Sequence, residues 1–291
     1  MFFQLLVNGL IAGAIYSLIA TGFSIIYSTC RFAHFAHGAV AAFAGYILFT
    51  FYQSLNLNFW LSSFLAIISA AFLGYFLNLT IYKQLRKRKA TSAVLLIASI
   101  ALLILIESLI LLFWGANIKT INFIEVAPGI EKLGAIITPL QITIILISVI
   151  LYVGFLLFMK RTKLGKAMRA VADNKDVAEI VGISAEKIYS WSFTIGSAIA
   201  GLAGILIALE QNLNPTMGTG LMIKGFTGAI IGGIGSVPGA ILGSYILGLA
   251  ENFGIWFLPS GYKDAIAFVL HFLFLLFKPQ GILTIKKGFQ K

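Results

Sequence analysis

Residues 93–114, AVLLIASIALLILIESLILLFW, form a run of 22 residues in which Glu107 carries the only charge. A transmembrane helix needs about 20 predominantly apolar residues, so this run is long enough to cross a bilayer. The chain is 59% hydrophobic and 11% charged, which is far from the composition of a soluble domain. Comparable runs recur at about 5–29, 35–54, 60–82, 139–159, 189–210, 223–235, 238–257 and 262–278. We therefore expect an all-α polytopic membrane protein, a bundle of about eight to ten transmembrane helices with nine as the simplest count.

The positive charge of the chain is gathered beside the apolar runs. The formal net charge is +11, and sixteen of the 21 Lys and Arg residues lie in three segments, 83–89, 160–187 and 278–291. Loops rich in Lys and Arg resist translocation, so these segments, including the C-terminus, are predicted to be cytoplasmic. Nine spans then leave the N-terminus outside, whereas a broken helix near 29–38 would place it inside. The charges flank membrane spans and form no face of a soluble fold, so the expected partner is membrane lipid and not nucleic acid.

The order of runs and breaks suggests a repeat within one transmembrane domain, residues 1–291. The run 5–29, the break at 30–38 and the following glycine-containing span resemble the run 189–210, the break at 211–222 and the glycine-rich span after it. With nine crossings, the two units have opposite orientation, as in inverted-repeat transporters. We expect a first repeat at about 1–114, a second at about 189–278, and a cytoplasmic loop at 160–188 between them.

The loop segment 162–187, TKLGKAMRAVADNKDVAEIVGISAEK, is too polar to span and too helical in composition to be a simple connector. It is predicted to form a short amphipathic helix or helix pair. Gly182 suits the position just after a helix, and Ser184 is placed to cap the next one. Such a helix can offer its apolar face to a groove of a partner, or it can lie in the membrane interface without a partner. The residues expected on the apolar side are Met168, Val171, Ala172 and Ala178.

Two further segments carry polar or irregular features at membrane depth. In FAHFAHG, 32–38, the imidazoles of His34 and His37 are costly unless they face protein or water. They are either part of a gate at a helix break or interfacial groups that cap a helix end. In 225–248, the stretch GGIGSVP at 232–238 makes a continuous helix improbable, and irregular backbone at this depth is tolerated where it is buried or lines a cavity. We expect this bend to line a pathway or to let it move.

Two carboxylates within the apolar runs are also candidates for function. Ionisable groups at membrane depth are rare and usually face a partner or a water-filled cavity. Glu251 lies toward the outer end of its predicted span and is the stronger candidate. Glu107 could instead pair with a neighbour such as His271.

Several short motifs follow one another in a specific order. Together they resemble the permease of ATP-binding-cassette importers in the branched-chain amino acid (LivH-type) family. The sequence departs from the usual family pattern at His34, where Asn is usual, and at Ala39, where Glu is usual. The matching residues are Asn8-Gly9 with Gly13, Tyr16-Ser17-Leu18, Phe35-Ala36-His37-Gly38, the loop 165–174 with Ala178 and Gly182-Ile183, Asn214-Pro215, 224–240, Tyr262-Lys263-Asp264 and 278–283.

The resemblance implies two groups of functional residues. One group would couple the permease to an ATPase: Gly165, Met168, Arg169, Ala170, Asp173, Asn174, Ala178 and Gly182. The other would line or gate the translocation pathway: Asn8, Phe35, His37, Gly38, Asn214, Pro215, Lys224, Gly232, Gly233, Gly235, Pro238 and Glu251.

The sequence contains no G-x-x-x-x-G-K-[ST] phosphate loop, so ATP and Mg are expected on partner subunits and no cofactor or metal on this chain. It also contains no constellation of a membrane-embedded enzyme, such as H-E-x-x-H. The resemblance implies a bacterial inner-membrane importer with two ATPase subunits, a second homologous permease and an extracytoplasmic amino-acid-binding protein. The implied cargo is leucine, isoleucine or valine. Urea or short amides are the alternative cargo, and a stand-alone secondary transporter is the alternative class.

Overall fold

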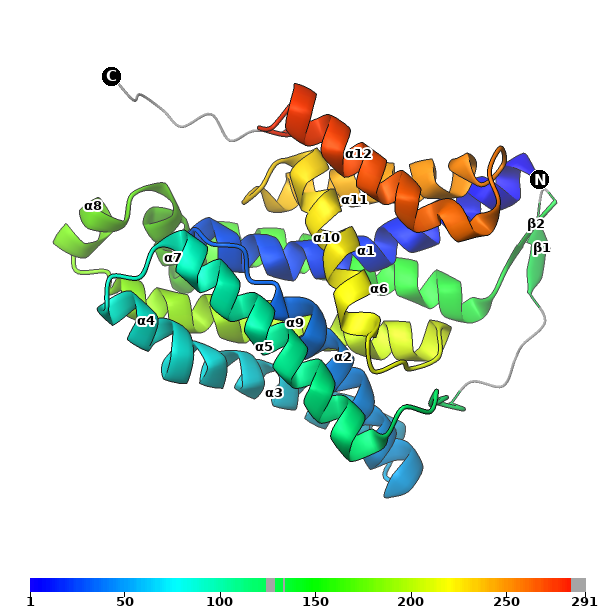
Figure 1. Ribbon diagram of the computed structural model, residues 1–291, viewed down its shortest axis with the longest axis horizontal. Coiled ribbons are helices and arrows are strands. Elements are labelled where there is room, and N and C mark those ends of the chain that lie inside the picture. Colours follow the sequence, from blue (N-terminus) through cyan, green and yellow to red (C-terminus); the bar gives the residue numbers. More distant parts are fainter. Residues whose placement is uncertain (124–128, 133, 284–291) are drawn as a thin grey trace.

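The computed structural model describes residues 1–123, 129–132 and 134–283, and these residues form an almost entirely helical bundle (Figure 1). The all-α class is therefore confirmed. A small antiparallel hairpin, β1 with β2, is the exception, and it pairs Ile130 with Ile137. The elements are α1 (Phe2–Cys30), α2 (Ala36–Phe49), the π-helix η1 (Thr50–Ser54), α3 (Phe59–Leu77), the π-helix η2 (Asn78–Tyr82), α4 (Lys83–Lys87), α5 (Ser92–Trp114), β1 (Ile130–Lys132), β2 (Ala135–Ile137), α6 (Pro139–Arg161), α7 (Lys163–Asp173), α8 (Lys175–Ile180), α9 (Ala185–Glu210), α10 (Met217–Gly232), α11 (Val237–Gly254), η3 (Ser260–Tyr262) and α12 (Lys263–Phe277).

All nine apolar runs are helical, but not all of them are separate membrane crossings. Within the described residues, six helices are long and apolar enough to span a bilayer. The pair α10 and α11 is bent by 114° at its break, and counting it as one span gives up to seven. The count of eight to ten therefore exceeds what the structure supports. The excess has two sources: α10 and α11 are two arms of one bent unit, and α2, which continues into η1 as far as Ser54, is not among the six spans.

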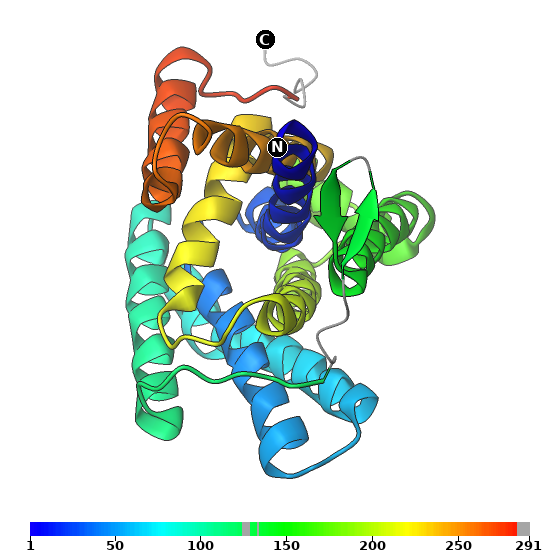
Figure 2. The same ribbon diagram turned by 90° about the vertical axis from the view of Figure 1, so that its right-hand side faces the viewer.

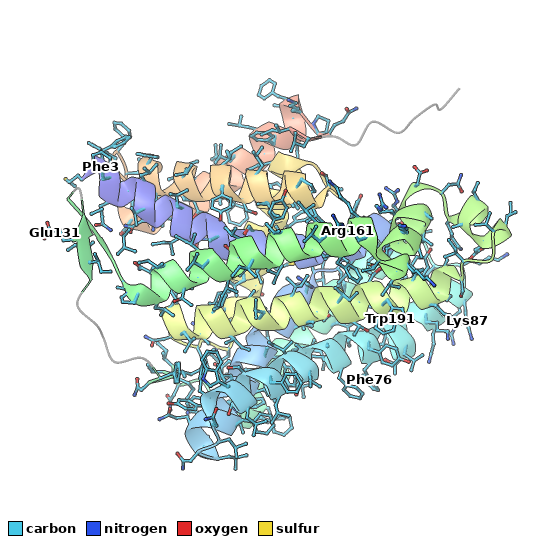
Figure 3. The ribbon with its side chains drawn as sticks, turned by 180° about the vertical axis from the view of Figure 1, so that it is seen from behind. Phe3, Phe76, Lys87, Glu131, Arg161 and Trp191 are labelled. Atoms are coloured by element: carbon cyan, nitrogen blue, oxygen red, sulfur yellow. The ribbon has the colours of Figure 1, made fainter. Side chains whose placement is uncertain are left out.

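The basic segments gather at one end of the bundle. Figure 1 shows α4, α7 and α8 at one end and the N-terminus with the β-hairpin at the other, and Figure 3 places Lys87 far from Phe3 and Glu131. We call the end with α4, α7 and α8 the basic end. Helix α1 is continuous from Phe2 to Cys30 and ends in the left-handed residue Arg31, with φ of 57°. The N-terminus consequently lies opposite the basic end. The basic residues Lys286, Lys287 and Lys291 lie outside the described residues.

Helices α1 and α9 form the centre of the bundle. Figure 2 shows them surrounded by α12, α5, α3 and α6. The α1–α11 contact is close because it is made through glycines: a Cβ at Gly248 would lie 2.5 Å from the backbone nitrogen of Gly13. Small residues allow such close approach between membrane helices. The outer helices, among them α6 and α12, bury few of their residues, as expected for contact with lipid.

Two short helices begin inside the bundle. After α1 the chain folds back, and α2 starts beside the middle of α1, where a Cβ at Gly22 would meet the ring of His37. Helix α10 starts against α2: a Cβ at Gly38 would lie 2.1 Å from the carbonyl oxygen of Gly218. From this meeting point the two helices run to opposite ends, α2 away from the basic end and α10 toward it (Figure 1). Each of the units α1–α2 and α9–α10 is thus a long helix followed by a short one, in opposite directions. The division into two repeats stays a prediction.

Candidate functional site

An ionic cluster lies beside the middle of α10. The ammonium of Lys224 is 3.0 Å from the carboxylate of Asp264 on α12 and 3.6 Å from that of Glu251 on α11. It also donates a hydrogen bond of 3.2 Å to the hydroxyl of Tyr16 on α1. Four helices therefore contribute to the cluster. The structure brings together Lys224 and Glu251, both predicted as pathway residues, and adds Tyr16 and Asp264.

Glu251 is the most buried member of this cluster. Its side chain is fully enclosed, and one carboxylate oxygen accepts a hydrogen bond of 2.7 Å from Tyr16. Its other oxygen, Oε1, has no hydrogen-bond partner in the described part of the chain. A buried carboxylate is costly unless it is paired and hydrogen-bonded. Tyr16 and Lys224 meet that requirement for one oxygen, Oε2. Asp264, in contrast, is 73% exposed, so it offers the ammonium a partner at the surface.

A second carboxylate is bound at the N-terminus of α10. Glu107 on α5 accepts hydrogen bonds from the backbone nitrogen of Thr219, at 2.8 Å, and from its hydroxyl, at 2.9 Å. Thr219 lies in the first turn of α10, where backbone N–H groups lack partners within the helix and the helix dipole favours negative charge. The suggested pairing of Glu107 with His271 is wrong. His271 instead lies 3.0 Å from the hydroxyl of Thr227.

These groups follow one side of α10. Figure 1 shows α10 crossing between α5 and α12 on the near side of the bundle. Along it lie the Glu107–Thr219 contact, the Lys224–Asp264 ion pair and the Thr227–His271 contact. Polar and ionisable groups at membrane depth rarely face lipid and mark pathways or protein contacts. We call this side the α10 face, defined by Glu107, Thr219, Lys224, Thr227, Asp264 and His271.

The predicted gate histidines lie in the interior. His34 and His37 are both fully buried, which excludes the reading as interfacial groups at a helix end. The ring of His34 is 2.9 Å from the hydroxyl of Tyr82. Neither ring nitrogen of His37 has a partner among the described residues, and the ring packs against Gly22 of α1. Phe35 is the member of this segment that reaches toward the α10 face, since its ring lies 5.0 Å from that of Phe226.

The other predicted pathway residues are dispersed. Asn8 accepts a hydrogen bond from Gln4 near the N-terminal end of α1. Asn214 is exposed and holds the turn before α10 by accepting from Thr216, and Pro215 beside it is buried. The glycine-rich break lies toward the basic end and far along α10 from Lys224. Its members are Gly232, Gly233, Gly235 and Pro238.

The break between α10 and α11 depends on glycine. Gly233 and Gly235 have φ of 119° and 84°, a backbone region that other residues rarely adopt. The segment after α12 closes over this break, because Leu283 and Ile282 donate backbone hydrogen bonds to the carbonyls of Gly232 and Ile231. The carbonyls at the end of α10 are thereby satisfied. The sequence motif at 278–283 was recognised as a family match, but its role in capping α10 was missed.

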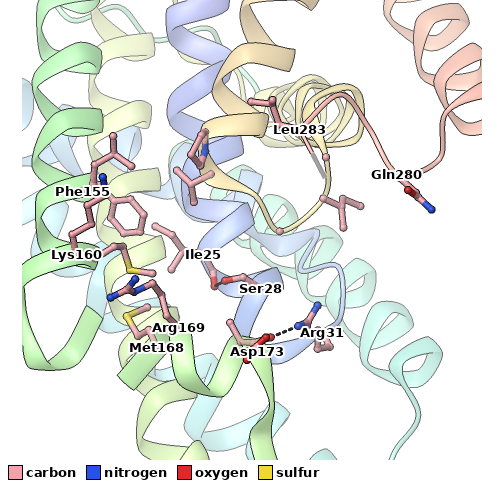
Figure 4. A pocket seen from close by; sticks show the side chains of 18 of the residues that line it. Ile25, Ser28, Arg31, Phe155, Lys160, Met168, Arg169, Asp173, Gln280 and Leu283 are labelled. Atoms are coloured by element: carbon pink, nitrogen blue, oxygen red, sulfur yellow. Dashed lines mark hydrogen bonds between the residues drawn. The ribbon is translucent and has the colours of Figure 1, made fainter. Parts of the chain in front are cut away.

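A large cavity lies between this break and helix α7. Its volume is about 760 Å³, and its walls come from α1, α6, α7, the break and the segment after α12. Figure 4 shows Lys160 and Arg169 on one side of it, with Arg31 across from them. Arg31 donates a hydrogen bond to the backbone carbonyl of Ala172 on α7. This hydrogen bond joins α7 to the C-terminal end of α1.

The predicted coupling residues divide into buried and exposed sets. Gly165, Met168 and Ala178 are buried and Ala170 is half-buried, because α7 packs against α6 and α9. At Gly165 the approach is so close that a Cβ would lie 2.4 Å from the carbonyl oxygen of Phe158. The apolar side expected to meet a partner thus faces the rest of the bundle. The exposed members are Arg169, Asp173, Asn174 and Gly182.

The exposed apolar surface of this region is instead on α8. Val177, Ile180 and Val181 are 54%, 83% and 68% exposed. Sequence analysis missed them, although three large aliphatic residues in a polar loop were a usable signal. Asn174 caps α8 by accepting from the backbone of Asp176 and Val177. Gly182, with φ of 85°, follows α8 as predicted, whereas Ser184 precedes α9 without a side-chain capping bond.

In the described ranges, no group of three or more His, Cys, Asp or Glu side chains could hold a metal ion. The groups that the site presents are charges, hydrogen-bond donors and helix ends. These groups can bind and release a small polar molecule or ion.

Comparison with known proteins gives consistent matches along the chain. The profile of the family described as "Branched-chain amino acid transport system / permease component" matches residues 5–275. The high-affinity branched-chain amino acid transport system permease protein BraD of Pseudomonas aeruginosa is 36% identical, over 97% of this chain and 95% of the relative. The permease protein LivH of Escherichia coli K12 is 32% identical over the same shares. A probable LivH of Methanocaldococcus jannaschii is 27% identical over 91% of this chain and 87% of its own length.

Proposed function

The chain belongs to the family of branched-chain amino acid transport system permease components, and we propose that it is the permease subunit of an ATP-driven importer for leucine, isoleucine and valine. The observation that carries the proposal is the 36% identity to a permease of that system over nearly the whole length of both chains. The multi-pass helical bundle and the charged groups at membrane depth agree with this role. The membrane is the bacterial inner membrane, and the basic end with the C-terminus faces the cytoplasm.

The α10 face is the proposed wall of the translocation pathway. An amino acid crosses as a zwitterion, so its path must offer partners for an ammonium and a carboxylate while the aliphatic side chain meets apolar residues. Lys224 can receive the carboxylate, and Glu251 or Asp264 can receive the ammonium. The Lys224–Asp264 ion pair is 3.0 Å long and lies at the surface of the chain. A second, homologous permease subunit would cover the α10 face and complete the path.

Helix α8 is the proposed docking point for an ATPase. An exposed aliphatic cluster on a helix at the cytoplasmic end can enter a hydrophobic groove of a partner, and Val177, Ile180 and Val181 form such a cluster. Two ATPase subunits, one for each permease, would bind ATP and Mg. The predicted coupling residues Gly165, Met168 and Ala178 then act indirectly, by fixing α7 and α8 to the bundle.

The route from the ATPase to the pathway would run through α7. Helix α7 contacts the end of α1 through Arg31, and α7 and the Gly233–Gly235 break form opposite walls of the same cavity. A small rotation of α7 can therefore change the angle between α10 and α11. Because α10 carries Lys224, a change in this angle would alter access to the ionic cluster. An extracytoplasmic binding protein would deliver the cargo to the opposite end of the bundle.

The test is ATP-dependent uptake by the purified and reconstituted system. The permease, its partner permease, the ATPases and the binding protein would be placed in liposomes, and uptake of radiolabelled leucine, urea and acetamide compared. We expect leucine uptake that needs ATP and every subunit. Uptake of urea or acetamide in place of leucine would overturn the assignment of branched-chain amino acids as the cargo. Concentrative leucine uptake by this chain alone, without an ATPase, would overturn the assignment to ATP-driven importers.

A further inference from the structure

The cavity at the basic end has a surplus of positive charge. Arg31, Lys160 and Arg169 line it, and among the described residues in its wall Asp173 supplies the one negative charge. The three cations come from separate elements, the end of α1, the last turn of α6 and the middle of α7. Figure 4 shows their side chains around the same space. Such an arrangement favours an anion over a cation or a neutral polar molecule.

Most of the rest of the wall is apolar, with Ser28 and Gln280 as its uncharged polar side chains. Ile25, Phe155, Met159 and Val237 face the cavity from α1, α6 and α11. A smaller pocket lies between the same three helices, farther from the basic end. Leu18, Leu151 and Ile241 are among its apolar lining residues, and Ser17, Thr21, Ser148, Tyr152 and Tyr245 add hydroxyl groups. Along α1, the positions from Ser28 to Leu18 correspond to a rise of about 15 Å. The two spaces thus follow one seam between α6 and α11, over α1.

The level of the cations in the bundle matches that of lipid headgroups. Lys160 and Arg31 lie at the ends of helices α6 and α1, where each span meets the membrane surface. The cytoplasmic leaflet carries anionic lipids, and basic pockets between transmembrane helices on that side bind their headgroups. The inference uses the orientation proposed above, with the basic end in the cytoplasm.

We propose that this cavity binds an anionic phospholipid, with the phosphate between Arg31, Lys160 and Arg169 and an acyl chain along the α6–α11 seam. The occupant would lie between α7 and the Gly233–Gly235 break. A bound lipid would therefore support the contact between the coupling helices and the bent pair.

The cargo offers the same two chemical features, an anionic group and an aliphatic chain. The size of the space favours the lipid: a cavity of about 760 Å³ lies in the upper part of the range for drug-sized ligands, about 300–1,000 Å³, and is large for a single amino acid. Phosphatidylglycerol and leucine thus become the two arms of the test.

The experiment is native mass spectrometry of the full-length permease, purified in detergent with its partner subunits. Phosphatidylglycerol, phosphatidylcholine and leucine are titrated separately. We expect phosphatidylglycerol to bind at least tenfold more tightly than phosphatidylcholine, and leucine not to displace it. Each Lys or Arg near an anionic lipid contributes a factor of about five in affinity. Lys160→Gln should therefore weaken phosphatidylglycerol binding about fivefold, and Lys87→Gln, an exposed cation on α4, should leave it unchanged.

A second variant tests the seam without changing the charge. Met159→Trp places a larger side chain in the apolar wall and should lower phosphatidylglycerol binding while the thermal unfolding of the complex stays unchanged. Arg169→Gln replaces Lys160→Gln if the latter does not fold. Equal binding of phosphatidylcholine, unchanged binding in the charge variants, or displacement of phosphatidylglycerol by leucine would each overturn the proposal. These binding measurements need no transport, so they can fail or succeed independently of the proposed uptake function.

Discussion

The hydroxyl of Tyr16 on α1 donates a hydrogen bond of 2.7 Å to the fully buried carboxylate of Glu251 on α11, across 235 positions of sequence. The contact joins the central helix to one arm of the bent pair. It also holds Glu251 where the ammonium of Lys224 reaches the same carboxylate. The stability of the bundle and the charge of the proposed pathway thus both depend on the side chains of Tyr16, Lys224 and Glu251.

Glu251→Leu should destabilise the permease, because it removes the buried partner of Lys224 and the acceptor of the Tyr16 hydroxyl. Lys224 keeps its ion pair with Asp264, so the loss should stay below the about 3–5 kcal/mol expected when a buried charge is left unpaired. Tyr16→Phe removes two hydrogen bonds with charged groups, one to Glu251 and one from Lys224, and should cost at least the about 1.5–3 kcal/mol of a single such bond. Thermal unfolding in detergent measures both, with the exposed Tyr262→Phe as the control. Unfolding temperatures equal to that of the unmodified chain would show that the cluster contributes nothing to the fold.

Lys224→Met should impair recognition of the carboxylate of the cargo. We expect the KM for leucine uptake to rise at least tenfold. We also expect the variant to lose its preference for leucine over leucinamide as a competitor, because leucinamide lacks the carboxylate. Lys119→Met, which changes a lysine of the loop after α5, serves as the control. If Lys224→Met kept both the KM and the preference, Lys224 would have no contact with the cargo.

Ile180→Asp should prevent docking of the ATPase without unfolding the chain. Ile180 is 83% exposed, so a charge there costs the isolated permease little but disfavours burial in a hydrophobic groove. Co-purification of the ATPase should fall at least tenfold, whereas Lys175→Ala on the same helix should leave it intact. Met168→Asp should behave differently and destabilise the permease itself, because Met168 is buried. Normal co-purification of Ile180→Asp would place the docking surface elsewhere.

Gly38→Val should disrupt the meeting point of α2 and α10. A Cβ at Gly38 would lie 2.1 Å from the carbonyl oxygen of Gly218, so the two helices must separate to admit it. We expect a loss of about 2–3 kcal/mol of stability, in the range of overpacked cores, and loss of uptake. The matched control is Gly220→Val on α10, where an added Cβ meets nothing within 4 Å. Equal effects of the two substitutions would contradict the close contact.

The features that sequence analysis predicted well depend on local composition. The run at 93–114 became α5, and the polar segment 162–187 became the helices α7 and α8 followed by Gly182 in a left-handed conformation. The family motifs could also be recognised from the order of residues alone. Each of these predictions needs only the residue types within one segment and the length of one helix.

The incorrect predictions concern which helix surfaces contact one another. Met168, Val171 and Ala178 were correctly placed on one apolar side, yet that side packs against the permease, and the exposed aliphatic residues are on α8. Glu107 was expected near His271, but it binds the first turn of α10. The count of spans was too high because a periodicity does not reveal that α10 and α11 bend by 114°.

By itself the sequence determined the membrane environment, the helical class and the basic end, since bilayer thickness and the cost of translocating charge act on single segments. The family followed from the order of its short motifs. Only the tertiary structure decided that Tyr16, Lys224, Glu251 and Asp264 form one cluster and that α2 and α10 begin face to face. The physical reason is that such contacts join helices far apart in the chain. Which helices contact one another depends on the packing of the whole bundle, and no local sequence pattern predicts it.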